Sequence, residues 1–371
     1  MKTCPYLHGA YRVYMKKVSC YFMTKIVKKI KYIAPWCIAA AIFAYMFREY
    51  PPSQLWHALK FVNVPAFAAL VLCYFLLMYL VDAFCMQRVI SRFSHAVTFK
   101  DIFIARGVTY LIMTINYPAS QAAFAYYLKR KYGIAIMQAL GIFIFIMFVD
   151  LFFLITLALV GSLFLDSKIV GIELAHTVRI VAVIAYACAF AWLAFWRKLP
   201  ERIFGKNFSN ALFDKLRKRN VFHIFEMAKT TDYLKIALMR SPIHLAIALF
   251  MYFVFATFGT HVPIAQILAN VPIVFLIGTL PITPGGLGTV NAAMVALLYP
   301  FVTGDAVDSA RISPQELVFT ATILWMFANF VMKAFTGSIL LRKISKDLFK
   351  PIPDVPRELV EREAAHLGGD F

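Results

Sequence analysis

The chain contains 64 consecutive residues, Ser241 to Gly304, without a single Asp, Glu, Lys or Arg. Shorter uncharged runs precede it, at Tyr32–Phe47, Phe61–Val81, Tyr132–Val149, Leu151–Leu165 and Ile180–Trp196. Several of them approach the ~20 apolar residues that a helix needs to cross the hydrocarbon core of a bilayer. With 61% hydrophobic and only 15% charged residues, the composition also departs from that of a soluble domain. The sequence therefore predicts an all-α polytopic membrane protein.

The net charge of +19 would suit a nucleic-acid partner, but the basic residues are confined to particular segments. They gather in the first 31 residues, in the segments 88–100, 129–131 and 197–235, and after residue 341. Lys and Arg accumulate in the cytoplasmic loops of membrane proteins. We therefore expect these segments and both termini to be cytoplasmic, and we expect no nucleic-acid partner.

The charge pattern predicts six spanning helices, near 32–47, 62–86, 133–163, 174–196, 236–258 and 316–341. Two further apolar segments are interrupted by helix-breaking residues: 102–128 at "NYPAS" and 264–299 at "PITPGGLG". Each half of these segments is shorter than a spanning helix, so we expect two re-entrant hairpins that enter and leave the membrane on one side. The alternative is that each half-hairpin is a very short spanning helix.

Both halves of the chain then contain the same parts in the same order: helix, helix, broken hairpin, helix. The first hairpin is expected to enter from the cytoplasm and the second from outside, which makes an inverted-topology repeat of the kind found in many secondary transporters. The expected organisation is a basic cytoplasmic arm (1–31), a first membrane repeat (32–165), a second repeat (172–341) that carries the basic cytoplasmic loop 197–235, and a cytoplasmic tail (342–371).

The two breaks are the candidate functional sites, because irregular backbone is tolerated at membrane depth where it is buried in protein or lines a cavity. Backbone N–H groups at a helix start can bind one anion. The candidate ligands at the second break are Thr283, Pro284, Gly285, Gly286, Gly288 and Asn291. Those at the first break are Asn116, Pro118, Ser120 and Gln121, with Arg106 on the half-helix below. Small residues in such breaks could equally serve close helix packing.

Asp150 falls at the middle of the predicted span 133–163, and Lys333 falls inside the predicted span 316–341, at equivalent positions of the two repeats. They are candidates for a transport role, and the alternative is a structural ion pair between them. Asp82 is predicted to pair with Arg88 near the cytoplasmic face. The histidines, His244 among them, have no second ligand at metal-binding spacing, and the cysteines are scattered, so neither a metal nor a cofactor is expected.

The stretch "LPITPGGLGTVNAAMVALL" resembles the proline–glycine signature of the lysylphosphatidylglycerol synthase transmembrane region, a flippase-like membrane domain. The segment that begins at "NYPASQ" resembles the first-half segment of that family, and the resemblance covers roughly residues 30 to 340. The family usually has a glutamate where this chain has Asn291. Only 30 residues follow Leu341, fewer than a self-standing domain needs, so no fused synthase domain is expected.

The resemblance implies an integral protein of a bacterial inner membrane that moves a phospholipid or a polyprenyl-phosphate-type lipid between leaflets. We accordingly predict a lipid transporter for a charged, phosphate-bearing headgroup. Two alternatives stay open. One is an intramembrane enzyme that modifies a lipid headgroup, for which Asp150 is the candidate general base. The other is a non-transporting scaffold for a lipid or glycan synthase.

Overall fold

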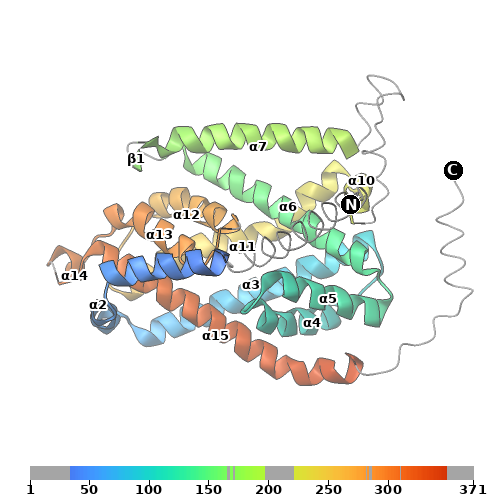
Figure 1. Cartoon of the computed structure of the whole chain (residues 1–371), viewed down its shortest axis with the longest axis horizontal. Helices are drawn as coiled ribbons and strands as arrows, with labels where there is room; N and C mark the ends of the chain where they lie inside the picture. Colours follow the sequence, from blue (N-terminus) through green and yellow to red (C-terminus); the bar gives the residue numbers. More distant parts are fainter. Residues whose placement is uncertain are drawn as a thin grey trace, which may run out of the picture. The chain divides into compact units, whose positions relative to one another are not determined.

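A computed structural model describes residues 34–164, 168–169, 172–196, 221–280, 282–283, 286–309 and 311–348, and most of them are helical (Figure 1). A helix at 34–49 comes first. The elements that follow are α2 (Pro52–Ala58), η1 (Leu59–Phe61), α3 (Val64–Phe93), α4 (Phe99–Met113), α5 (Tyr117–Tyr132), α6 (Ile136–Gly161), β1 (Lys168–Ile169), β2 (Ile172–Glu173), α7 (Leu174–Trp196), α10 (His223–Met227), α11 (Thr230–Thr257), α12 (Ile264–Thr279), α13 (Thr289–Leu298), η4 (Tyr299–Phe301), α14 (Asp305–Asp308) and α15 (Pro314–Leu348). The predicted arm 1–31, residues 197–220 of the predicted basic loop and the tail beyond 348 lie outside the described residues.

Five of the described helices are long and apolar enough to cross a membrane: α3, α6, α7, α11 and α15. This confirms the predicted all-α polytopic class, with two-residue strands β1 and β2 as a minor addition. The helix boundaries shift in one consequential place. α11 begins at Thr230, six residues before the predicted start near 236, and it continues through Pro242. Arg240, which the sequence placed near the edge of this helix, therefore lies in its third turn.

The first broken segment forms a helical hairpin, α4 followed by α5. The two helices have 15 and 16 residues, and at 1.5 Å per residue each is roughly 23 Å long, which is less than the ~30 Å of a hydrocarbon core. At the turn, the side chain of Asn116 caps α5 by accepting the Ala119 N–H at 2.8 Å. At the base, Asp101 of α4 accepts hydrogen bonds from Lys131 and Tyr132 at the end of α5, both at 2.6 Å. The start of α4 and the end of α5 therefore lie side by side.

The second broken segment is closed in a comparable way, although the contacts differ. α12 has 16 residues and α13 has 10, so neither approaches the length of a span. His261, before α12, and Thr303, after α13, exchange two backbone hydrogen bonds of 2.8 and 3.0 Å. This bridge ties the two ends of the hairpin together, and the described residues between α12 and α13 (280, 282–283 and 286–288) belong to its tip. The structure thus contains two base-closed hairpins, which Figure 1 shows as the pairs α4–α5 and α12–α13.

The chain divides into two compact units that interleave along the sequence. The first unit comprises Met1–Phe67, Leu157–Val178 and Met251–Leu324, and contains the hairpin α12–α13. The second comprises Ala68–Thr156, Arg179–Phe250 and Trp325–Phe371, and contains the hairpin α4–α5. Each of the five long helices begins in one unit and ends in the other. The predicted repeats 32–165 and 172–341 and their opposite sidedness stay predictions.

An aromatic core holds the second unit together. The ring of Phe145 (α6) lies 5.6 Å from that of Phe93 (α3), 5.4 Å from that of Phe225 (α10) and 4.8 Å from that of Tyr233 (α11). Such edge-to-face aromatic pairs add ~0.5–1.5 kcal/mol each beyond the area that they bury. These contacts join α3, α6, α10 and α11 next to the first hairpin, which is itself anchored by fully buried Phe124.

The sidedness of the two hairpins can be tested with single cysteines at their bases. Lys129 ends the first hairpin and Asp305 follows the second, and both side chains are exposed. In a background with all six native cysteines replaced, Lys129→Cys and Asp305→Cys should react with an impermeant thiol reagent from opposite sides of the membrane, because basic loops are retained in the cytoplasm. Labelling of both from one side would contradict the inverted repeat.

Candidate functional site

A network of charged side chains is buried in the second unit, and Arg240 of α11 lies at its centre. The guanidinium of Arg240 donates to both carboxylate oxygens of Asp150 (α6), each at 2.6 Å. Its third donor bonds to Asp82 (α3) at 2.9 Å. The side chains of these three residues are at most 19% exposed. Paired N–H donors that match a carboxylate are among the strongest hydrogen bonds in proteins, so Arg240 fixes three long helices to one another.

The network continues in both directions from Arg240. Asp82 also accepts hydrogen bonds from Arg106 Nε at 2.5 Å and from the Tyr110 hydroxyl at 2.8 Å, both on α4. Arg106 in turn donates to the side-chain oxygen of Gln121 on α5 at 3.2 Å. At the other end, Nε2 of His244 lies 3.0 Å from Asp150. The first hairpin is therefore joined to α3, α6 and α11 through side chains whose charges balance, two arginines against two aspartates.

Lys333 of α15 stands apart from these pairs. None of the described residues forms an ion pair or a hydrogen bond with it. The alternative of an ion pair between Asp150 and Lys333 is therefore wrong, because Arg240 occupies both carboxylate oxygens of Asp150. The predicted interfacial pair of Asp82 is wrong for the same reason, since both of its oxygens bond to buried arginines.

At the first break, most of the predicted ligands have structural partners. Asn116 caps α5, Pro118 occupies its first turn, and the Ser120 hydroxyl donates to the Tyr117 carbonyl at 2.8 Å. Gln121 differs from them. Its side-chain oxygen is bonded to Arg106, but its Nε2 is buried without a hydrogen-bond partner among the described residues. A buried donor of this kind is costly, which makes Gln121 the strongest polar candidate at this tip.

At the second break, Pro284 and Gly285 lie outside the described residues. Gly286 and Gly288 have φ angles of 75° and 81°, a left-handed conformation that glycine adopts at little cost. A Cβ on Gly286 would also lie 2.7 Å from the Val290 side chain. Glycine is therefore required here by the backbone and by packing, so a substitution at Gly286 tests folding before it tests function.

The polar groups of the second break bond to one another. The hydroxyls of Thr283 and Thr289 lie 3.1 Å apart, and the Thr289 hydroxyl also donates to the Gly286 carbonyl at 3.1 Å. The N–H of Gly286 donates to the Thr283 carbonyl at 3.3 Å. Asn291 is buried in the first turn of α13. Hydrogen bonds within the break thus satisfy several of the groups that the sequence assigned to a ligand.

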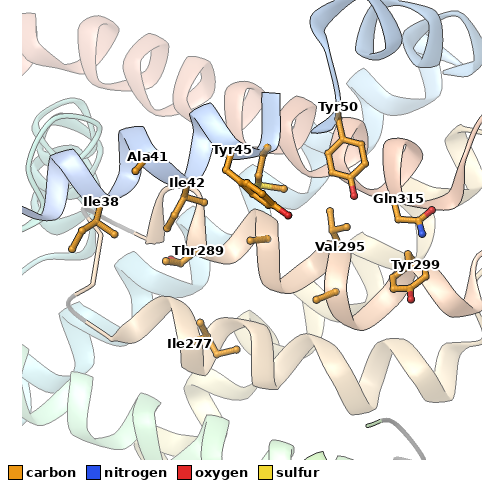
Figure 2. A pocket seen from close by; sticks show the side chains of 13 residues that line it. Ile38, Ala41, Ile42, Tyr45, Tyr50, Ile277, Thr289, Val295, Tyr299 and Gln315 are labelled. Atoms are coloured by element: carbon orange, nitrogen blue, oxygen red, sulfur yellow. The ribbon is translucent and has the colours of Figure 1, made fainter. Parts of the chain in front are cut away.

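Beside this break lies an open cavity of about 810 Å³ within the first unit. Most of its lining is apolar, and it comes from the helix 34–49, α12, α13 and the start of α15. Figure 2 shows Ile38 and Ile277 near Thr289, at the start of α13, and Tyr50, Tyr299 and Gln315 together at the other end. The volume is in the range of small-molecule sites, ~300–1,000 Å³. The arrangement suits a hydrocarbon chain rather than a charged group.

Sequence reasoning missed Arg240, Asp82 and His244 as members of the network. Arg240 directly precedes the long uncharged stretch and fell near the start of the predicted helix 236–258, and its partner Asp82 is 158 positions away. One signal was available: an acidic residue in each of two apolar helices requires a buried cation. No group of three or more His, Cys, Asp or Glu side chains in the described ranges has the geometry of a metal site.

The contribution of the buried network to the stability of the protein can be measured with two arginine variants. Arg240→Gln leaves Asp82 and Asp150 without their shared cation, and breaking a buried ion pair costs about 3–5 kcal/mol. Arg92→Gln is the matched control, because Arg92 also pairs with an aspartate, Asp232, but its side chain is 55% exposed, and such pairs contribute about 0–1 kcal/mol. Thermal unfolding should show a large loss of stability for Arg240→Gln and a small one for Arg92→Gln. Equal losses would contradict a central role of Arg240.

Comparison with protein families matches residues 32–337 to the lysylphosphatidylglycerol synthase TM region. The matched range includes both hairpins and the whole buried network. No match was found among curated proteins. Since the family match covers most of the chain, the protein is an integral membrane protein with a lipid-related function, and it belongs to the lysylphosphatidylglycerol synthase transmembrane-region family.

Proposed function

We propose that the protein moves a lipid with a charged, phosphate-bearing headgroup between the leaflets of a membrane. The observation that carries the proposal is the pair of base-closed hairpins, whose helices are too short to span and whose tips interrupt the backbone ladder. Such irregular backbone at membrane depth serves to line a polar route. Family membership supports a lipid as the substrate.

The polar route requires groups that replace the water around a headgroup. At the first hairpin these are supplied by the buried network, which brings Arg106 and Gln121 together beneath the tip. A charged group inside a membrane is expensive unless it has partners. The protein would lower that cost by offering fixed charges and donors that are already desolvated. The hydrocarbon chains need no such help, because they stay in an apolar environment throughout.

The cavity of the first unit supports the proposal because it offers a place for the apolar part of the lipid. We propose that it holds a hydrocarbon chain of the transported lipid while the headgroup passes. Ile42, Ile277, Val295 and neighbouring alanines line it, and the broken tip begins beside it at Thr289 (Figure 2). A lipid is the one abundant ligand in a bilayer that offers a long flexible apolar chain to such a space.

The proposal is tested by lipid translocation in reconstituted vesicles. A fluorescent phosphatidylglycerol placed in one leaflet should become accessible to an added quencher from the other side, at a rate that rises with the amount of protein. If folded protein moves no lipid, the proposal fails. Conversion of the headgroup without movement would instead favour an enzyme, and binding of a synthase without either would favour a scaffold.

Filling the cavity should block this movement without harming the fold. Ala296 lines the cavity and its side chain is exposed to it, so Ala296→Phe places a ring in existing space and should leave the melting temperature close to that of the parent. The rate of translocation should fall by about tenfold or more, equivalent to ~1.4 kcal/mol or more in the barrier.

The matched control is Ala187→Phe, at an exposed position of α7 that does not line the cavity. Because α7 contributes no residue to the lining of the cavity, this variant should translocate lipid at the parental rate. Unchanged transport by Ala296→Phe in a folded protein would remove the cavity from the proposal.

A further inference from the structure

The charges around the first hairpin do not sum to zero. Arg106 and Arg240 are matched by Asp82 and Asp150 through direct ion pairs of 2.5–2.9 Å. Lys333 adds one positive charge that no described residue neutralises. Counted over these arginine, aspartate and lysine side chains, the group carries an excess of one positive charge. Lys333 is half-buried. A cation that is partly removed from water without a partner is unfavourable, and a ligand with one negative charge would reduce that penalty.

The position of Lys333 relative to the hairpin follows from the packing of α15 on α4. A Cβ on Gly337 would lie 2.6 Å from the Leu111 Cβ, and Gly107 packs against Leu340. As residue numbers fall along α15, those of its partners on α4 rise, so the two helices are antiparallel. Lys333 lies one turn before Gly337, about 6 Å further along the axis. That shift places it toward the end of α4 and the tip of the hairpin.

Gln121 approaches the same tip from α5. It lies in the second turn of this helix, and Cβ atoms tilt toward the helix N-terminus, which for α5 is the tip. The side chain is only 6% exposed, its oxygen accepts from Arg106, and its Nε2 is a donor without a partner among the described residues. Arg106 bonds to Gln121, and the next residue, Gly107, packs against Leu340 of α15, the helix that carries Lys333.

We infer that Lys333, the Gln121 Nε2 and Arg106 form a binding site for a single phosphate monoanion at the first hairpin, and that the lipid it accepts carries a net charge of −1. The inference rests on the proposed function and narrows it. A phosphodiester presents several acceptor oxygens and one charge, which match two cationic groups, one amide donor and one charge to neutralise. A zwitterionic headgroup brings its own cation next to Lys333 and is therefore disfavoured.

The second hairpin does not offer an equivalent site. Thr283, Gly286 and Thr289 bond to one another within the break. Asn270 of α12 donates to Gln266, and its buried Oδ1, which has no partner among the described residues, is an acceptor and does not suit an anion. The cavity beside it is mostly apolar. Among the residues that the structure describes, the charged contacts of a headgroup are thus concentrated on the first hairpin and on α15.

The test is binding of short-chain lipids to the purified protein in detergent, measured by the rise in melting temperature with lipid concentration. Short-chain phosphatidylglycerol should bind about tenfold or more tightly than short-chain phosphatidylcholine, a difference of ~1.4 kcal/mol or more. Lys333→Met should abolish this preference, and Lys333→Arg should keep it. Lys343→Met is the matched control, because Lys343 is an exposed lysine of the same helix. It should bind phosphatidylglycerol as the parent does.

Gln121→Glu provides a second variant if Lys333→Met does not fold. Glutamate keeps the oxygen that accepts from Arg106 but supplies the negative charge from the protein itself, so phosphatidylglycerol should bind about tenfold or more weakly. Inorganic phosphate at millimolar concentration should not displace the lipid. Full displacement would show a site for soluble phosphate and would overturn the lipid assignment.

Binding and transport can fail separately, which keeps the two proposals distinct. If Lys333→Met binds phosphatidylglycerol as tightly as the parent, or if both lipids bind equally, the phosphate site is wrong even when vesicles show lipid movement. If the preference depends on Lys333 but no lipid moves, the site stands and the transport proposal is wrong.

Discussion

The contacts of Arg240 are the interaction on which the second unit depends. Three of its donors bond to carboxylates of two other helices, at 2.6, 2.6 and 2.9 Å. Asp82 passes the connection on to Arg106, so the hairpin α4–α5 is held against α3 by charge as well as by packing. Hydrophobic burial cannot fix the relative orientation of these helices, because in lipid one apolar face of a helix packs much like another. The ion pairs fix the orientation of these helices, and the tip of the first hairpin is placed accordingly.

The helices could be predicted from sequence because each depends on its own residues. Uncharged runs predicted the long helices with end positions off by up to seven residues, and the proline and glycine breaks predicted both hairpins. The partners of Asp150 could not be found in the same way. Arg240 lies next to the uncharged stretch, and the predicted start of its helix, near 236, left it close to an end. With the helix beginning at Thr230, Arg240 is buried and must have a counter-charge. A boundary error of six residues thus became an error in the site.

The candidate ligands at the first break likewise could not be told apart from sequence alone. Asn116 and Ser120 are polar residues at a break, as the sequence suggested, yet they bond to the first turn of their own helix. Sequence pattern does not separate a capping residue from a ligand, because both have the same chemistry and position. Only its surroundings in the structure distinguish Gln121 from these capping residues: its side-chain oxygen has a partner, and its side-chain nitrogen has none among the described residues.

The two hairpins share a design but differ in chemistry, and this difference bears on mechanism. Lys333, half-buried and without a counter-charge among the described residues, lies toward the tip of the first hairpin, and the second hairpin borders an apolar cavity of about 810 Å³. A lipid is likewise a charged group joined to apolar chains, and the chains gain nothing from fixed charges. A transporter with two similar hairpins would gain if one hairpin served the headgroup of the lipid and the other served its hydrocarbon chains. Glycine at 286 and 288 would then serve to shape the turn, and selectivity for the headgroup would depend on the few charged side chains around the other tip.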